Sequence, residues 1–235
     1  MNGRMASRSL AELTTADVAG TAPILAVPVG SCEQHGPHLP LGTDTIIAEH
    51  LAGRLAAEVA RVVVAPALAV SASGEHAAFP GTLSIGREVT TAVLVELARS
   101  ADWAAGIVLV NGHGGNREAV EAASATIRAE GRNVLAWWPR VEGGDAHAGH
   151  TETSLLLAIR PDLVAGDRLE AGDPRQLATI GAELRRGGVA AVSPNGVLGD
   201  PRAATLGAGN LLLDLLAAEL VAATRRAIAA GWISP

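Results

Sequence analysis

Short apolar runs rich in β-branched residues alternate along this chain with longer segments whose apolar residues recur at helical spacing. The short runs, which we expect to be buried strands, are Ile24–Val29, Val62–Ala65, Ile107–Val110 and Val134–Trp138. The longer segments, which we expect to be helices, are Asp44–Ala60, Arg87–Ala101 and Asn116–Glu130. Strands that alternate with helices form βαβ units, in which helices cover both faces of a mostly parallel sheet. The pattern therefore predicts a three-layer α/β/α fold.

Polar residues at the ends of the predicted helices are suited to capping. Thr43 or Asp44 is the expected N-cap of the first helix, and Asn116 is that of the third. A last helix is predicted from about Asn210 to Ala230, where leucines recur on one face and would cover the core.

One segment departs from this alternation. Residues Ala165–Ala204 are richer in Gly, Pro and Arg, and we expect them to be irregular, as a subunit contact or the rim of a site. No internal repeat, low-complexity block or linker interrupts the chain. Its 235 residues suffice for one large α/β domain with a substantial core, so a single domain over residues 1–235 is expected.

The composition excludes several functions. The formal net charge is −6, whereas a nucleic-acid surface needs a basic stripe. All 18 basic residues are arginine, which excludes a phosphate-binding P-loop lysine and a lysine Schiff base. No apolar run of membrane-spanning length is free of charge, and Met1–Leu10 carries two arginines without an apolar segment. We therefore expect a cytoplasmic chain with no membrane span and no nucleic-acid partner.

Cys32 is the single cysteine, which excludes an internal disulfide and a cysteine-rich zinc site. Its neighbour Glu33 makes a nucleophilic or ligand role worth considering. The interpretation we favour is a small packing residue at the start of a loop, because strand alternation would turn Cys32 away from Glu33.

Polar, metal-binding residue types follow each of the four predicted strands, and six of the seven histidines lie in these loops. The carboxyl ends of parallel strands meet at one edge of a sheet, so these side chains are expected to converge. In order along the chain they are Glu33, His35, His38 and Asp44, then Glu75 and His76, then His113, then Asp145, His147, His150 and Glu152. Mixed nitrogen and oxygen ligands suit borderline divalent metals. The pattern therefore predicts a metallohydrolase.

Four of these residues form the strongest candidate set. Glu33 and His35 would point to the same side of an extended segment, and the two oxygens of Asp44 can bridge two metals. His113 lies among glycines that allow close backbone approach. Two metals about 3.5–4 Å apart would polarise a carbonyl and activate water. Any one of these residues alone is more simply a satisfied polar group in a turn.

The other candidates keep alternatives open. His38, between prolines, is a loop brace or a ligand, and Glu75 with His76 line a substrate pocket or support a loop. His50 is expected to be structural.

His147, His150 and Glu152 open a predicted helix over Leu155–Ile159. Of His147 and Glu152, one would complete the metal shell while the other moves protons. The alternative is an ordinary N-cap at Thr151.

These residues resemble the creatininase family of metal-dependent amidohydrolases. The matching motifs are Gly30-Ser31-x-Glu33-Gln34-His35-Gly36-Pro37-His38-Leu39-Pro40, then Asp44, Asn111-Gly112-His113-Gly114-Gly115-Asn116 and His147-Ala148-Gly149-x-x-Glu152-Thr153-Ser154. The resemblance implies a dinuclear site with Glu33, His35, bridging Asp44 and His113 as ligands. It also implies His147 as an acid/base group.

One position departs from the family members that act on creatinine, which carry a ligand glutamate where this chain has Gly115. A replacement ligand must come from elsewhere, and Glu152 is the expected one. Creatinine hydrolysis is therefore not the favoured reaction.

The chain is similar instead to a peptidase branch of the family, which releases the modified Val-Tyr C-terminal dipeptide of a ribosomally made precursor peptide that becomes a redox cofactor. The supporting segments are Ser73-Gly74-Glu75-His76, Gly81–Gly86, Asp145–Ser154, Arg186–Pro194 and Gly196–Pro201. The alternatives are a hydrolase of a small cyclic amide or formamide, and an inactive homologue that serves as a subunit.

The resemblance also implies two divalent metal ions per subunit and a homo-oligomer, with a hexamer favoured and an octamer as the other option. Ligands without thiolate admit zinc, iron and manganese, and the order of affinities does not choose among them. Zinc and iron, alone or together, are the expected metals.

Overall fold

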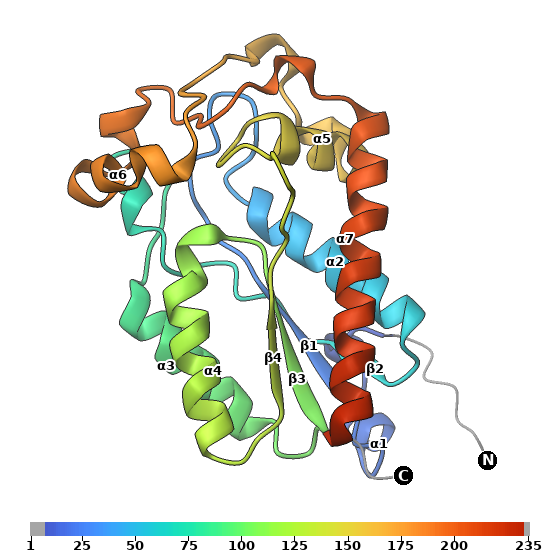
Figure 1. The fold of residues 1–235 in the computed structure, drawn as a ribbon. Coiled ribbons are helices and arrows are strands. Elements are labelled where there is room, and N and C mark those ends of the chain that lie inside the picture. Colours follow the sequence, from blue (N-terminus) through green and yellow to red (C-terminus); the bar gives the residue numbers. More distant parts are fainter. Residues whose placement is uncertain (1–7, 233–235) are drawn as a thin grey trace.

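The computed structural model describes residues 8–232, and a central sheet of four strands organises them in the order β2-β1-β3-β4 (Figure 1). The strands are β1 (Ile24–Val29), β2 (Val62–Val64), β3 (Gly106–Asn111) and β4 (Val134–Trp137). All three pairings are parallel, and the central strands β1 and β3 are buried along their whole length. Burial on both faces explains why their sequences are continuous apolar runs. The four predicted strands are confirmed, each end within one residue.

Helices cover both faces of this sheet (Figure 1). Alternate residues of β1 pack in opposite directions, with Leu25 and Val27 in one hydrophobic cluster and Ile24 and Ala26 in the other. The first cluster is completed by α3 (Arg87–Ser100) and α4 (Arg117–Ala129), and the second by α2 (Thr43–Glu58), α5 (His150–Ile159) and α7 (Leu206–Ala227). The predicted three-layer α/β/α fold is confirmed.

Shorter elements connect these layers. They are α1 (Thr15–Val18), η1 (Leu10–Glu12), η2 (Gly74–His76), η3 (Gly114–Asn116), η4 (Pro161–Leu163), η5 (Gly166–Arg168), η6 (Pro201–Ala203) and the π-helical turn η7 (Ile228–Trp232). Of the N-terminal segment discussed above, residues 1–7 lie outside the described residues.

The expectation of an irregular segment over Ala165–Ala204 is wrong in its middle, where α6 (Leu177–Val192) forms. This helix buries Ile180 and Val189 in a small cluster of its own, and it is kinked at Gly188, whose φ is 67°. Gly188, one of the glycines that suggested a loop, therefore allows a kink within a helix. A Cβ at Gly188 would lie 2.6 Å from the carbonyl oxygen of Glu75, so the kink brings α6 against η2.

The predicted cap of α2 is wrong, that of α4 lacks its side-chain bond, and the alternative of a cap at Thr151 is not what α5 shows. Gly42 is the N-cap of α2, and Gly149, not Thr151, is the N-cap of α5. Asn116 holds the N-cap position of α4 without a side-chain cap bond, because its amide is used elsewhere. It accepts from the Ala72 N–H at 3.1 Å and donates to the Gly30 carbonyl at 3.0 Å.

The C-terminal helix begins at Leu206, four residues before the predicted start, with Thr205 as its N-cap. The stretch Leu206–Trp232 is the one helix of the described residues that is long and apolar enough to cross a membrane, with 33% of its most apolar window buried. Helices that pack on the core of a soluble protein meet the same criterion. The expectation of a cytoplasmic chain without a membrane span stays a prediction.

Candidate metal centre

The candidate ligands converge at the carboxyl ends of the strands. The loop after β1 supplies Glu33 and His35, and the first turn of α2 supplies Asp44. Two glycines let the strand ends approach that turn, since a Cβ would lie 2.1 Å from the Thr45 side chain at Gly30 and 2.4 Å from the Asp44 carbonyl oxygen at Gly112. Asp44 is therefore placed by close backbone packing.

Asp44 lies between two imidazoles. Its Oδ1 is 3.2 Å from the Nε2 of His35, and its Oδ2 is 3.1 Å from the Nδ1 of His113. The Ser31 hydroxyl donates to Oδ2 at 2.7 Å, which fixes the rotation of the carboxylate. Burial would raise the pKa of Asp44, but the two histidines hold it well below its usual value. An ionised carboxylate with its oxygens on two different partners has the arrangement of a bridging ligand.

Glu33 is fully buried and lies beside Asp44. Its Oε1 is 3.1 Å from the Nδ1 of His113 and 3.3 Å from the Nε2 of His76. Neither carboxylate oxygen has a hydrogen bond of acceptable geometry from the residues that the structure describes. A buried carboxylate without donors is costly unless a cation compensates it. This orphaned oxygen pair fits a metal.

His113 presents its two nitrogens to different surroundings. Nδ1 faces Glu33 and Asp44, while Nε2 lies 3.0 Å from the Ala72 carbonyl oxygen and 3.4 Å from Oε1 of Glu75. Because a carbonyl can only accept, Nε2 carries a proton. Burial would lower the pKa of His113, but the surrounding carboxylates, Glu33 first, raise it well above its usual value, so Nδ1 holds a second proton that a bound metal would replace.

A second group combines His35, Asp44 and Glu152. The Oε2 of Glu152 is 3.9 Å from the Nε2 of His35, and it accepts from the Ala148 N–H at 2.6 Å. Burial raises the pKa of Glu152 to about 7. Burial would lower the pKa of His35, but the carboxylates of Asp44, Glu152 and Glu33 together outweigh it and raise the pKa to about 9. The described residues thus hold two ligand groups that share Asp44, with the ligand atoms of each within 4.8 Å of one another.

His147 lies over both groups. Its Nδ1 is 3.9 Å from Oε1 of Glu33 and 4.0 Å from Oε2 of Glu152, and its Nε2 is 2.8 Å from the Gln34 carbonyl oxygen. A third ligand group joins it to Glu33 and His35. Burial holds the pKa of His147 well below its usual value. The imidazole is therefore neutral, with the lone pair of Nδ1 directed toward the two carboxylates.

Asp145 places this part of the site by capping α5. Its carboxylate accepts from the backbone N–H groups of His150 and Thr151. Gly149 and Gly199 leave room for it, because a Cβ at either would lie within 2.5 Å of its Oδ2. The turn before α5 is tight, with Ala148 at a φ of 52°.

The remaining candidates have structural or neighbouring positions. The Nε2 of His38 shares a hydrogen bond with the Thr153 hydroxyl at 2.9 Å, which braces the loop. The Sγ of Cys32 lies 3.7 Å from the Gly81 carbonyl oxygen. His50 lies on α2, and no ligand group of the described residues includes it. His76 is buried at the centre beside Glu33.

Two residues at the centre had no signal of their own in the sequence. Ser31 orients Asp44, as described. Gln34 uses its Nε2 atom at 2.8 Å from His76 Nδ1 and 3.0 Å from the Gly196 carbonyl oxygen. Their only sequence signal is their position next to Glu33 within the first motif.

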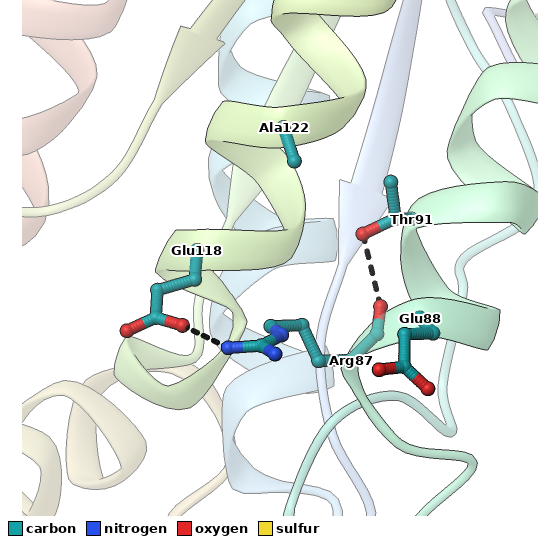
Figure 2. Close-up of a pocket in the computed structure, with 5 residues that line it drawn as sticks. All are labelled: Arg87, Glu88, Thr91, Glu118 and Ala122. Atoms are coloured by element: carbon teal, nitrogen blue, oxygen red, sulfur yellow. Dashed lines mark hydrogen bonds and ion pairs between the residues drawn. The ribbon is translucent and has the colours of Figure 1, made fainter.

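A separate surface hollow of about 430 Å³ lies between α3 and α4 (Figure 2). Figure 2 shows two of its polar contacts, between Arg87 and Glu118 and between the Thr91 hydroxyl and the Arg87 carbonyl. Their lengths are 2.5 Å and 2.9 Å. It contains none of the candidate ligands, so the chemistry belongs to the buried centre.

The fold and this centre define a hydrolase of a known class. Residues 11–224 match the family model of creatinine amidohydrolase, called creatininase, so the chain belongs to the creatininase family. Among its relatives, the mycofactocin precursor peptide peptidase of Mycolicibacterium smegmatis is 52% identical over 203 residues, which cover 83% of this chain and 82% of that protein. The protein of the same name from Mycobacterium tuberculosis is 48% identical over 223 residues, 90% of this chain and 88% of that one. The resemblance to the peptidase branch is confirmed.

Solved structures agree with the fold. A mutant creatininase of Zn-Zn type superposes with a TM-score of 0.76 at 25% identity, and a creatininase with Mn with a TM-score of 0.75 at 26%. Each covers 94% of this chain and 98% of the other.

Proposed function

We propose that this chain is a metal-dependent peptidase that acts on the mycofactocin precursor peptide and releases its modified Val-Tyr C-terminal dipeptide during redox cofactor biosynthesis. Relatives with that substrate in their name are 48–52% identical over most of the chain. The observation that carries the proposal is the pair of ligand groups that share Asp44.

The residues divide between two divalent ions. Glu33, Asp44 and His113 would hold the first, and His35, Asp44 and Glu152 the second. Nitrogen and oxygen donors admit zinc, iron or manganese, with zinc and iron proposed here. When bound, such ions supply Lewis-acid polarisation of the scissile carbonyl and lower the pKa of water.

The chain itself supplies proton transfer and orientation. His147, neutral and held through Nε2 by the Gln34 carbonyl, is the group that takes a proton on Nδ1 and delivers it to the leaving amine. Its own position is fixed by backbone hydrogen bonds with Leu198 at 3.3 and 2.8 Å. The Ser31 hydroxyl holds the Asp44 carboxylate in the orientation in which one oxygen faces His35 and the other faces His113.

The first test measures metal content and cleavage together. Purified protein should carry close to two metals per chain and should release the dipeptide from enzymatically modified precursor, followed by mass spectrometry. Asp44→Ala should lose both metals and the activity, because Asp44 belongs to both groups. Asp167→Ala, an exposed aspartate on η5, is the matched control and should retain both. A fully active metal-free preparation contradicts the proposal.

The second test addresses the substrate. Creatinine amidohydrolase of Pseudomonas putida is 31% identical over 62% of this chain, so a small cyclic amide or a formamide is the alternative substrate. Parallel assays should show turnover of the modified precursor and no turnover of creatinine or formamides. The reverse result would establish the alternative, and tight binding of precursor without cleavage by metal-loaded protein would identify an inactive homologue.

We also propose a homo-oligomer, with a hexamer favoured over an octamer. Leucines on α7 support an association surface, since Leu211 is 68% and Leu215 69% exposed. Light scattering coupled to size exclusion should give a mass near six chains, and a stable monomer would contradict this.

A further inference from the structure

The structure shows what occupies the space beside Gly115, where creatinine-acting relatives are expected to carry a ligand glutamate. A Cβ built at Gly115 would lie 2.0 Å from Oε1 of Glu75 and 2.4 Å from Nε2 of His113. The space is therefore filled by a carboxylate from a different loop. Gly115 and Glu75 depend on each other, because any side chain at position 115 must displace the Glu75 carboxylate and would also press on the His113 ring.

Glu75 is held at this place by its own backbone. It belongs to η2, the short turn after β2, and its carbonyl oxygen lies against the kink of α6 at Gly188, where a Cβ would be 2.6 Å away. The side chain is 34% exposed, so the carboxylate is on the open side of the centre while its tip reaches the His113 ring. The kinked helix and the turn thus fix where this carboxylate can be.

Glu75 contacts His113 on the side of the ring that faces away from Glu33 and Asp44. Oε1 of Glu75 is 3.4 Å from Nε2, whereas Glu33 and Asp44 are each 3.1 Å from Nδ1. None of the three ligand groups of the described residues includes Glu75. As placed in this structure, Glu75 thus lies outside these groups, and it touches the centre through the imidazole of His113.

We propose that Glu75 is a positioning residue for His113. The Glu75 carboxylate, together with the Ala72 carbonyl, keeps a proton on Nε2 of His113, so that Nδ1 is the nitrogen that offers its lone pair to a metal. The proposal rests on the proposed metal centre. Histidines that bind metals usually donate their other ring N–H to a carboxylate or carbonyl, which fixes the tautomer and raises the basicity of the ligand nitrogen. In this chain both kinds of acceptor face the same nitrogen.

The direct test compares Glu75→Ala and Glu75→Gln with the wild type, with Glu49→Ala as a control that removes an exposed carboxylate from α2. Chelator competition with zinc should show affinity for one of two metals per chain falling by about 10- to 100-fold in Glu75→Ala, the usual effect of losing an outer partner. Glu75→Gln keeps an acceptor oxygen without the charge and should fall between wild type and Glu75→Ala. Glu49→Ala should bind both metals normally.

A second readout follows the imidazole itself. In the zinc-loaded protein, long-range ¹H–¹⁵N spectra should show His113 protonated at Nε2 in the wild type. In Glu75→Ala the His113 signals should shift or broaden, because one of two acceptors is lost. Gly115→Ala should lower metal affinity at least as much, because its Cβ would displace the Glu75 carboxylate and would also meet the His113 ring. Adding Glu75→Ala to Gly115→Ala should lower the affinity by less than the product of the two single effects.

The outcomes separate this proposal from the proposed function. If the wild type binds no metal, both fail. If the wild type binds two metals and Glu75→Ala and Glu75→Gln bind them with unchanged affinity and an unchanged His113 signal, the positioning role alone is overturned. A fall in kcat/KM with intact metal binding would also overturn it, because Glu75 would then contact the substrate. Thermal unfolding of each variant identifies a folding defect. If Glu75→Ala has one, the metal affinity of Glu75→Gln, which preserves the shape of the side chain, decides whether Glu75 positions His113.

Discussion

The two ligand groups of the centre differ in how they are built. Glu33, Asp44 and His113 are 0%, 1% and 4% exposed and come from backbone next to the two central strands. The other group depends on Glu152, whose side chain is 21% exposed and lies on α5, behind a turn with Ala148 at a positive φ. The first group is assembled by the core of the sheet, whereas the second is completed by a capped helix at the rim. We therefore expect the first metal to bind more tightly and exchange more slowly.

The largest effect is expected from breaking the buried group. Glu33→Gln keeps the shape of the side chain and removes its charge, so the first metal should be lost and activity should fall by more than the roughly 100-fold typical of outer-shell changes. Metal analysis and cleavage rate measure this. Both metals bound at wild-type affinity would show that Glu33 is not a ligand.

Glu152→Gln probes the rim group and should have the next largest effect. Metal content should drop by about one per chain while the first group stays filled, since Asp44, Glu33 and His113 are intact. Activity should be lost with it. If both metals remain and only activity is lost, Glu152 acts as a general base. An experimental structure with its carboxylate turned away from the metals would contradict both roles.

Asp145→Ala tests whether the helix cap sustains the rim group. Losing the cap of α5 should cost about 1 kcal/mol of unfolding free energy. It should also weaken the second metal only, because Glu152 lies in the first turn of that helix. Thr205→Ala removes the N-cap of α7 and is the matched control, with a similar loss of stability and normal metal binding. Equal metal binding in Asp145→Ala and Thr205→Ala would show that the Asp145 cap does not support the second ligand group.

The smallest expected effect is a pH dependence in chelated protein. Burial raises the pKa of Glu152 to about 7, above the 4.5 of an unfolded glutamate. The folded chain then binds more protons than the unfolded chain between these values, so Glu152 lowers stability as pH rises through this window. Glu152→Gln should therefore gain stability relative to the wild type, on the order of 1 kcal/mol, between pH 5 and 8. Denaturation curves of the wild type and Glu152→Gln that give the same stability difference at pH 5 and at pH 8 would contradict this.

The sequence is most informative where a residue's role depends on its own strand or motif. Buried parallel strands such as β1 leave continuous apolar runs, and loops after strands must meet at one edge, so the strands and the convergence of Glu33, Asp44 and His113 were predictable. The helix α6 was missed because Gly188 at its kink looks like a loop residue.

Roles that depend on contacts between distant segments were not predictable. Asn116 looks like a helix cap, yet it joins the loops at Ala72 and Gly30. Likewise, Gly115 indicates only that a side chain is missing. That Glu75 fills the space depends on how η2 packs against α6, which is a tertiary contact without local pattern.

The close packing of Gly30 and Gly112 against the first turn of α2 has a consequence for variation in this architecture. The turn that carries the carboxylate shared by both ligand groups is placed by the contacts of Gly30 with Thr45 and of Gly112 with the backbone of Asp44, and neither glycine has a side chain to shorten. The position of this shared carboxylate is thus a property of how a helix sits on two strands. Substitutions elsewhere in the centre can change which ion would bind or what substrate is accepted without moving it. We expect diversity among such enzymes to accumulate at rim segments such as η2 and α6, around a shared carboxylate that keeps its place.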